Sequence, residues 1–313
     1  MPILCGTGVL YVKQRKAGNP CPAGPPAGFE QHRAQNCQIG AVMTRTPMSD
    51  RRERSHRPQG NRGRRPFSGR DRQRGGGGPI LLYGWHSVLA ALENPNRRIR
   101  KLFATENAVR RLTEAGIALK EPPEVVRPET IAARLSDDAV HQGLLAEADP
   151  LPSPELSEIE GPLVLVLDQL TDPHNVGAIV RTASAYGVAA IVTTARHSPE
   201  ATGVLAKSAS GGLEHVPFVL VKNLARAMNE LKERGFQLVG LDEEAETELS
   251  QAVLRAPFAL VLGAEGKGLR HLTLETCDLR ARLTLPGTIK SLNVSNAAAV
   301  ALHIATTQIA KAR

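Results

Sequence analysis

The carboxyl-terminal half of the chain alternates short apolar runs with longer stretches whose apolar residues recur at helical spacing. The runs have strand length and are bounded by Gly, Pro or Asn, so they predict buried strands. The pattern predicts strands at 163–167, 189–192, 218–221, 237–241, 258–262 and 282–285, and helices at 176–186, 224–234 and 294–311. This alternation is typical of an α/β fold with a mostly parallel sheet and helices on both faces.

A smaller set of periodic segments comes before it. The pattern predicts strands at 99–104 and 123–126, and helices at 107–115, 128–135 and directly after Gly84. We therefore expect a small α/β domain over residues 80–148. A proline-rich linker follows at 149–161, since proline fixes φ and disfavours helix at the residue before it. The second domain then covers residues 162–313.

The first 79 residues show neither the helical nor the strand spacing of apolar residues, and they carry the excess positive charge. They hold 15 Lys and Arg against 4 Asp and Glu, a net +11, whereas the remaining residues hold 24 against 27, a net −3. Much of this segment is rich in Arg and Gly and has too few aliphatic residues to offset chain entropy, so we expect a disordered tail. Its arginines either tether the protein to a polyanion by neutralising phosphates or belong to a merely solvated linker.

Three of the four cysteines, Cys5, Cys21 and Cys37, lie in that tail. Their spacing is not that of a CxxC pair and no His pair follows, so we expect neither a disulfide framework nor a metal site. Met48 has the character of a natural start residue, which makes residues 1–47 a candidate over-extension of the predicted gene. We find no signal-peptide pattern and no apolar run of membrane-spanning length, and expect a cytoplasmic protein.

Three blocks of the second domain place polar side chains where the chain leaves a strand. In the first, Asp172 can cap a helix whose free N–H groups face an anion or polar ligand. Asn175 offers a donor and an acceptor, and Arg181 carries a fork that can hold phosphate. We expect Asn175 and Arg181 to lie on nearly one side of this helix. Taken alone, the block is equally that of a capped helix with a surface arginine.

The second block places Glu265 among glycines directly after the strand at 258–262. The glycine order is GxxGxG rather than GxGxxG, which disfavours a dinucleotide-binding fold. Gly263 and its neighbours let the backbone approach a ligand, and Glu265 can accept hydrogen bonds from a hydroxyl or a base edge. In the third block, Ser291 and Asn293 stand at the entrance of the closing helix, where capping is their ordinary role. The preceding turn lacks the Gly-Lys pair of a nucleoside triphosphatase.

The blocks read LDQLTDPHNVGAIVRTASAYG, LVLGAEGKGL and LTLPGTIKSLNVSNAAAVAL. In order and spacing they resemble the SpoU/TrmH family of RNA ribose 2′-O-methyltransferases, over roughly residues 80–313. Tyr83-Gly84-Trp85-His86 and His141-Gln142-Gly143 are similar to the family's RNA-recognition domain. The resemblance implies a trefoil-knotted methyltransferase domain, S-adenosylmethionine as cofactor and a homodimer.

The resemblance also implies roles for individual residues. The implied catalytic residues are Asn175, Arg181, Glu265, Ser291 and Asn293. Backbone around Leu262, Gly263, Leu285 and Leu292 is implied to enclose the adenosine. Arg181 is implied to help remove the proton of the ribose hydroxyl. An arginine is a poor base because its pKa exceeds about 12, so it needs a substrate phosphate as relay, or it orients the hydroxyl.

We therefore interpret the chain as an S-adenosylmethionine-dependent methyltransferase acting on a guanosine in 23S rRNA or a ribosome precursor. One alternative is a tRNA ribose methylase, although such enzymes more often rely on short terminal helices than on an α/β domain. The other is a non-catalytic RNA-binding protein of the same fold, which would need none of the implied catalytic residues together.

Overall fold

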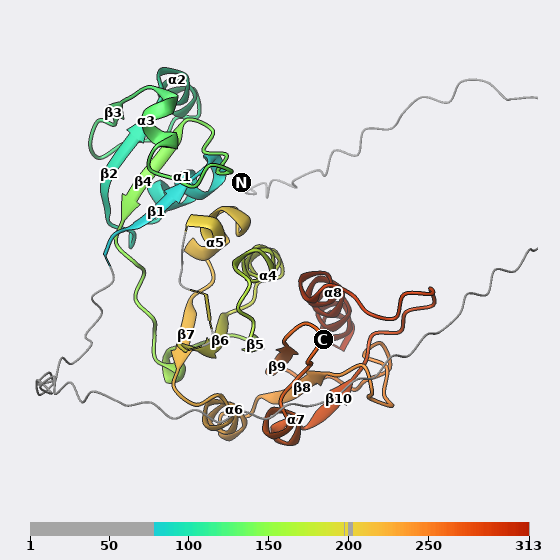
Figure 1. The fold of residues 1–313 in the computed structure, drawn as a ribbon. Coiled ribbons are helices and arrows are strands. Elements are labelled where there is room, and N and C mark those ends of the chain that lie inside the picture. Colours follow the sequence, from blue (N-terminus) through green and yellow to red (C-terminus); the bar gives the residue numbers. More distant parts are fainter. Residues whose placement is uncertain (1–77, 197, 200–202, 313) are drawn as a thin grey trace, which may run out of the picture. The chain divides into compact units, whose positions relative to one another are not determined.

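The computed structural model of the protein describes residues 78–196, 198–199 and 203–312. These residues form a four-stranded sheet of order β1-β4-β2-β3 and a six-stranded sheet of order β10-β8-β9-β5-β6-β7 (Figure 1). The expected disordered tail, apart from Gly78 and Pro79, lies outside the described residues, as do the interpretation of residues 1–47 and the cysteines within them.

The four-stranded sheet carries helices on both faces. Its elements are β1 Ile80–Tyr83, α1 Trp85–Glu93, β2 Ile99–Ala104, α2 Glu106–Glu114, β3 Glu124–Val125, α3 Pro128–Ala132 and β4 Leu144–Ala148. Strand β4 pairs antiparallel with β1 and β2, and β3 adds parallel to β2. Alternate residues of β4 face opposite ways: Leu144 packs with residues of α1 and α2, and Leu145 packs with Ile131 of α3.

The six-stranded sheet is parallel throughout its ladder. After a 3₁₀ turn at Leu156–Glu158, its elements are β5 Leu163–Asp168, α4 Pro173–Ala185, β6 Ala190–Thr194, α5 Gly203–Ser208, β7 Phe218–Val221, α6 Leu224–Glu233, β8 Gln237–Leu241, β9 Phe258–Gly263, α7 His271–Thr276, β10 Leu279–Ala281 and α8 Val294–Ala312, with a second 3₁₀ turn at Gly212–Glu214. All six residues of β5 are buried. A strand covered on both faces has no solvent side, which is why its sequence is an unbroken apolar run.

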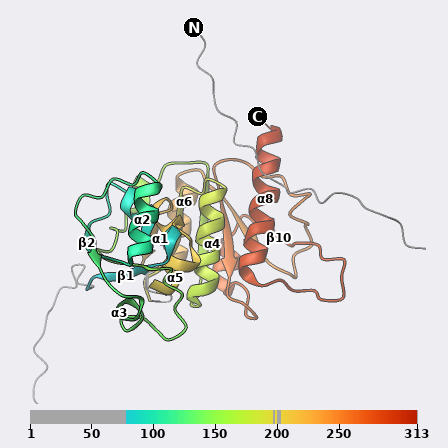
Figure 2. The ribbon, with the colours of Figure 1, turned by 90° about the horizontal axis from the view of Figure 1, so that it is seen from above.

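Helices cover both faces of this sheet. Leu165 and Leu167 of β5 pack with residues of α4 and α8, whereas Val164 and Val166 pack with residues of α6. Figure 1 shows α4 and α8 on one side of the row of strands and α6 and α7 on the other, and Figure 2 shows α4 beside α8. The expected α/β fold with a parallel sheet and two helical layers is confirmed.

Several details differ from the expectation, and β1, β4 and β10 were not among the predicted strands. The strand predicted at 282–285 is wrong, because β10 ends at Ala281 and Arg282 makes only an isolated bridge to Glu248. Leu283 still packs on the core, so its apolar position reflects burial without strand pairing. Helices α5 and α7 were not predicted, since six residues are too few for a periodic signal.

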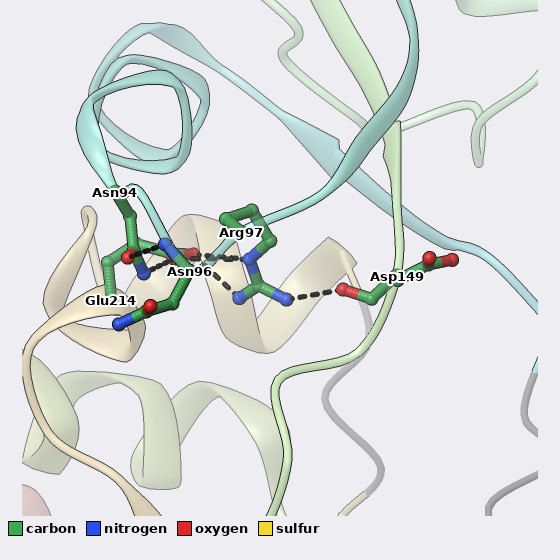
Figure 3. A network of polar contacts seen from close by, with 5 residues as sticks. All are labelled: Asn94, Asn96, Arg97, Asp149 and Glu214. Atoms are coloured by element: carbon green, nitrogen blue, oxygen red, sulfur yellow. Dashed lines mark hydrogen bonds and ion pairs between the residues drawn. The ribbon is translucent and has the colours of Figure 1, made fainter.

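A buried ion pair ties the segment after α1 to the segment after α5 (Figure 3). Arg97 Nη2 lies 2.7 Å from Glu214 Oε1, and the two side chains are 2% and 3% exposed. Asn94 donates to the same carboxylate at 2.7 Å, and Arg97 Nη1 donates to the carbonyl oxygen of Asp149 at 2.7 Å. Because every charge in this network is hydrogen-bonded, the pair holds the small sheet's connections firmly against the α5 region.

Candidate active site

The first block forms the amino terminus of α4 as the sequence indicated. The Asp172 carboxylate accepts hydrogen bonds from the backbone N–H of His174 at 3.0 Å and of Asn175 at 3.4 Å. Pro173 takes the first helical position, where its missing N–H costs nothing. This cap fixes where α4 begins, and so places the Asn175 side chain at the carboxyl edge of the parallel sheet.

Three sequence-remote side chains meet at that edge. Asn175 Nδ2 donates to Glu265 Oε2 at 3.4 Å, and Asn293 Nδ2 donates to Asn175 Oδ1 at 2.9 Å. The Asn175 amide therefore uses its donor on one partner and its acceptor on the other. The structure thus brings together one predicted residue from each of the three blocks.

Of the serines near the third block, Ser295 rather than Ser291 holds Asn293. Asn293 Oδ1 accepts from the Ser295 N–H at 2.9 Å and from the Ser295 hydroxyl at 2.6 Å. Ser291 is exposed, and within the described residues its hydroxyl makes no hydrogen bond. This role of Ser295 was not predicted from the sequence. Its signal is the spacing of Asn followed two residues later by a donor at a helix start, the pattern of an Asx turn.

The turn after β9 is built on a close backbone approach at Gly263. A Cβ at this position would lie 2.2 Å from the carbonyl carbon of Gly268, so no other residue fits. The Gly268 N–H donates to the Ala264 carbonyl oxygen at 2.8 Å and closes the turn. Glu265 stands exposed within it, which is how its carboxylate reaches Asn175.

The segment from 283 to 292 places backbone polar groups next to apolar side chains. Within the described residues, its N–H and C=O groups make no hydrogen bond to other backbone groups, and the Leu285 carbonyl oxygen accepts from Lys290 Nζ at 3.2 Å. Leu285 and Leu292 are half-buried, and Leu262 is buried at the end of β9. Free backbone donors and acceptors beside leucines suit an adenosine, whose ring is apolar on its faces and polar at its edge. The predicted cofactor residues thus fit a nucleoside.

Arg181 does not share a side of α4 with Asn175, and that expectation is wrong. Successive helical residues are rotated by about 100°, so six residues turn the side chain by about 240°. Seven residues make nearly two full turns, so His174, seven positions before Arg181, lies on the same side of the helix as Arg181. His174 and Arg181 line one cavity of about 340 Å³ together with Tyr83, Lys207 and Ser208. A larger cavity of about 1500 Å³, lined by residues such as Pro152 and Phe218, contains none of the predicted site residues.

Asp168 is a second residue that the sequence analysis left without a role. Its carboxylate is 1% exposed at the end of β5 and accepts from Thr273 Oγ1 at 2.7 Å. It also accepts from Arg270, whose Nη2 lies 2.7 Å away and whose backbone N–H donates at 3.2 Å. Because Arg270 follows the Gly263 turn closely, Asp168 anchors the far end of that turn. The sequence signal for Asp168 was its position as the one acidic residue at the end of an otherwise apolar strand.

Within the described part of the chain, no group of three or more His, Cys, Asp and Glu side chains is arranged to hold a metal ion. Cys277 donates to the Thr273 carbonyl oxygen at 3.2 Å, and burial raises the pKa of its thiol to about 12. No helix among these residues is long and apolar enough to cross a membrane.

Two family models match the chain, and together they cover both sheets. The model described as the SpoU rRNA Methylase family matches residues 162–303. The model described as RNA 2′-O ribose methyltransferase substrate binding matches residues 81–154.

The chain is also similar to named proteins over most of their lengths. It is 41% identical over 239 residues to the 23S rRNA (guanosine-2′-O-)-methyltransferase RlmB of Pseudomonas putida, covering 72% of this chain and 96% of that protein. It resembles a crystal structure of an RNA 2′-O ribose methyltransferase with a TM-score of 0.62 at 27% identity, covering 74% of this chain and 89% of the other. The SpoU methyltransferase AviRb from Streptomyces viridochromogenes shares the fold, with a TM-score of 0.65 at 23% identity over 75% of this chain and 91% of that one.

Proposed function

This chain belongs to the SpoU family of RNA methylases, and we propose that it methylates the ribose 2′-hydroxyl of a guanosine in 23S ribosomal RNA, with S-adenosylmethionine as methyl donor. The observation that carries the proposal is the contact of Asn175 with Glu265 and Asn293, one residue from each of the three blocks, at the carboxyl edge of the sheet. The proposed substrate places the enzyme with the ribosome in the cytoplasm.

The cofactor residues are proposed on their fit to a nucleoside. Backbone around Leu262, Gly263, Leu285 and Leu292 would hold the adenosine, and the bound cofactor supplies a methyl group on a positively charged sulfur. The Gly263 turn keeps side chains away from this space, because Gly268 backbone stands where a Cβ would be. The two half-buried leucines exclude water from one face of it.

The polar residues are proposed to order the reacting ribose. Asn175 is held from two sides, so its amide has one orientation, and Glu265 keeps acceptor capacity for a hydroxyl. Alignment of the hydroxyl oxygen with the methyl carbon can itself be worth roughly 7–11 kcal/mol. Arg181 is proposed to orient the ribose or its phosphate, because a guanidinium has five N–H donors and no acceptor, and a phosphate of the substrate then takes the proton of the hydroxyl. Ser291, exposed beside Asn293, is the remaining proposed contact to substrate.

We assign the domains as residues 80–148 for RNA binding, 149–161 as linker and 162–313 for methyl transfer. The substrate-binding and methylase family matches support this division. We also propose the knotted topology and a homodimer in which Arg181 of one subunit serves the cofactor site of its partner. Within one chain Arg181 lies on a different side of α4 from the Asn175 contact, and a second copy supplies a reason for that separation.

The test is a map of ribose methylation in RNA from a strain that lacks the gene, with the gene restored as control. We expect one guanosine of 23S rRNA to lose and regain its 2′-O-methyl group. Restoration with Asn293→Ala should fail although the protein accumulates. A lost methyl group in tRNA would establish the tRNA alternative instead. An unchanged map in both RNAs, together with no binding of S-adenosylmethionine, would leave only a non-catalytic RNA-binding protein.

A further inference from the structure

The cavity beside Arg181 gathers charged and polar side chains from both halves of the described chain. It measures about 340 Å³. α4 contributes His174 and Arg181, α5 contributes Lys207 and Ser208, and the loop before β4 contributes Asp138. None of Lys207, Ser208 and Asp138 belongs to the proposed methyl-transfer site.

In the part of the chain that the structure describes, the two cations of this cavity form no ion pair, although Asp138 lines the same cavity. Among the described residues, no carboxylate lies within ion-pair distance of Arg181 or Lys207. This contrasts with Arg97 and Arg270, whose guanidinium groups are paired with Glu214 and Asp168. Two unpaired cations that face one cavity favour an anionic ligand.

Backbone proximity, rather than flexible side chains, brings α5 to α4. Gly177 of α4 would meet the Ser208 side chain at 2.5 Å and the Leu205 carbonyl oxygen at 2.7 Å if it carried a Cβ. The missing side chain therefore lets α5 approach until Lys207 and Ser208 stand beside the His174 and Arg181 side of α4. The Ser208 hydroxyl lies 3.4 Å from His174 Nδ1.

The position of Lys207 is fixed at the junction with the small domain. Its ammonium group donates to the Val140 carbonyl oxygen and lies 5.4 Å from the centre of the Tyr83 ring. Burial lowers the pKa of Lys207. A carbonyl and a ring face stabilise an ammonium less than an anion does, so the group keeps attraction for a phosphate.

We propose that this cavity binds a phosphodiester group of the substrate RNA next to the methylated nucleotide, with Lys207 and the Ser208 hydroxyl as its ligands. This inference rests on the proposed function, because it takes the RNA substrate and the role of Arg181 from it. The charge of one phosphate falls beside Arg181, so the bound backbone and the reacting ribose are positioned together.

The charge of Asp138 should oppose the binding of a phosphate in this cavity. Its carboxylate lines the same cavity, and a hydrogen bond from Ser136 with the nearby His174 lowers its pKa, so it is ionised at neutral pH. An ionised carboxylate repels a phosphate that enters the cavity. Removing the charge of Asp138 should therefore strengthen RNA binding, whereas removing that of Lys207 should weaken it.

The experiment uses the full-length protein and a fragment of 23S rRNA that the enzyme methylates, with RNA affinity measured over a range of KCl concentrations. Lys207→Gln should raise Kd roughly tenfold at low salt, as expected for loss of a hydrogen bond to a charged group. It should also lower the slope of log affinity against log salt by about one. Asp138→Asn should lower Kd, and KM should follow Kd in both variants while kcat on saturating RNA stays near that of the unchanged protein.

Lys311→Gln is the matched control. Lys311 is exposed near the end of α8, 18 residues after Asn293, so it lies about 27 Å along the helix from the Asn293 end. This variant should show the same slope of log affinity against log salt as the unchanged protein. Calorimetric binding of S-adenosylmethionine to each variant checks that it is folded. If Lys207→Gln proves unstable, Lys207→Arg keeps the positive charge and should show the slope of log affinity against log salt of the unchanged protein.

A salt slope unchanged in Lys207→Gln, or RNA binding weakened by Asp138→Asn, would overturn the inference while leaving the proposed function intact. RNA methylation absent from the unchanged protein would instead overturn the proposed function. Replacing single phosphates of the RNA by neutral methylphosphonates locates the contact. One such replacement should abolish the difference between the unchanged protein and Lys207→Gln.

Discussion

Asn293 donates a 2.9 Å hydrogen bond to Asn175, a residue 118 positions earlier in the chain. The contact links the start of α8 to the start of α4, and the Ser295 hydroxyl in turn holds Asn293 at 2.6 Å. Asp172 caps α4, and Asn293 accepts the Ser295 N–H at the start of α8 through its Oδ1, so the Nδ2 bond between the two asparagines is not a capping bond. This bond is the part of the pair that we assign to the proposed site.

Asn293→Ala should lower turnover strongly. It removes the donor to Asn175 and leaves that amide free to turn, and losses of 1–3 kcal/mol for such a bond correspond to roughly 5–150-fold in rate. Ser295→Ala should cause a smaller loss, because Asn293 keeps the Ser295 backbone N–H as partner. Single-turnover methylation at saturating RNA and cofactor measures both. Equal activity of Asn293→Ala and the unchanged protein would remove Asn293 from the site.

Gly263→Ala should abolish cofactor binding and lower the melting temperature. The added Cβ meets Gly268 backbone at 2.2 Å, and backbone cannot rotate away as a side chain does. Gly287→Ala is the control for stability, because its Cβ would meet nothing within 4 Å. Thermal unfolding and calorimetry with S-adenosylmethionine give the two readouts. Normal binding by Gly263→Ala would contradict the assignment of this turn to the cofactor.

Arg181→Ala should lower turnover far more than affinity for the cofactor, because the guanidinium faces the cavity and not the Asn175 contact. Both quantities are measured on one preparation. A loss of cofactor affinity with a normal single-turnover rate would show that the assignment is wrong.

Subunit mixing tests the proposed homodimer. If Arg181 acts on the partner's site, subunits with Arg181→Ala mixed with subunits with Asn293→Ala should form heterodimers in which one site has both residues intact. Activity should then rise on mixing two proteins that are each of low activity. A fully active monomer in light scattering at micromolar concentration would reject the dimer altogether.

Glu214→Ala should destabilise the protein by about 3–5 kcal/mol, because it leaves the Arg97 charge buried without its partner. Replacing both residues together, Arg97→Met with Glu214→Leu, should cost less than Glu214→Ala alone, since neither charge is then left unpaired. Chemical denaturation measures the free energies of unfolding. A loss below about 1 kcal/mol for Glu214→Ala, the value of an exposed pair, would contradict the burial of this network.

Deletion of residues 1–79 should leave cofactor binding intact and weaken RNA binding. The segment carries a net charge of +11 against −3 for the remainder. If its arginines neutralise phosphates, the truncated protein should show a shallower dependence of log affinity on log salt. An identical slope would assign the tail to a solvated linker.

The pattern of apolar and capping residues was enough to predict the parallel α/β architecture and the start of α4. Strands such as β5 are buried on both faces, so their apolar runs are unbroken and visible without any partner. The cap by Asp172 was equally visible, since it depends on residues two and three positions away. Local interactions leave local patterns, and these were the features that the sequence alone predicted correctly.

Only the tertiary structure decided which residues meet. The bonds of Asn175 to Glu265 and Asn293 span 90 and 118 positions, and a polar side chain shows nothing of a partner so distant. The grouping of Arg181 with His174 and Lys207 depends on how closely α5 approaches α4, which Gly177 permits but does not specify. The pairing of Arg97 with Glu214 likewise arises only when two sheets have formed, because burial strengthens a charge pair and burial is a property of the folded chain.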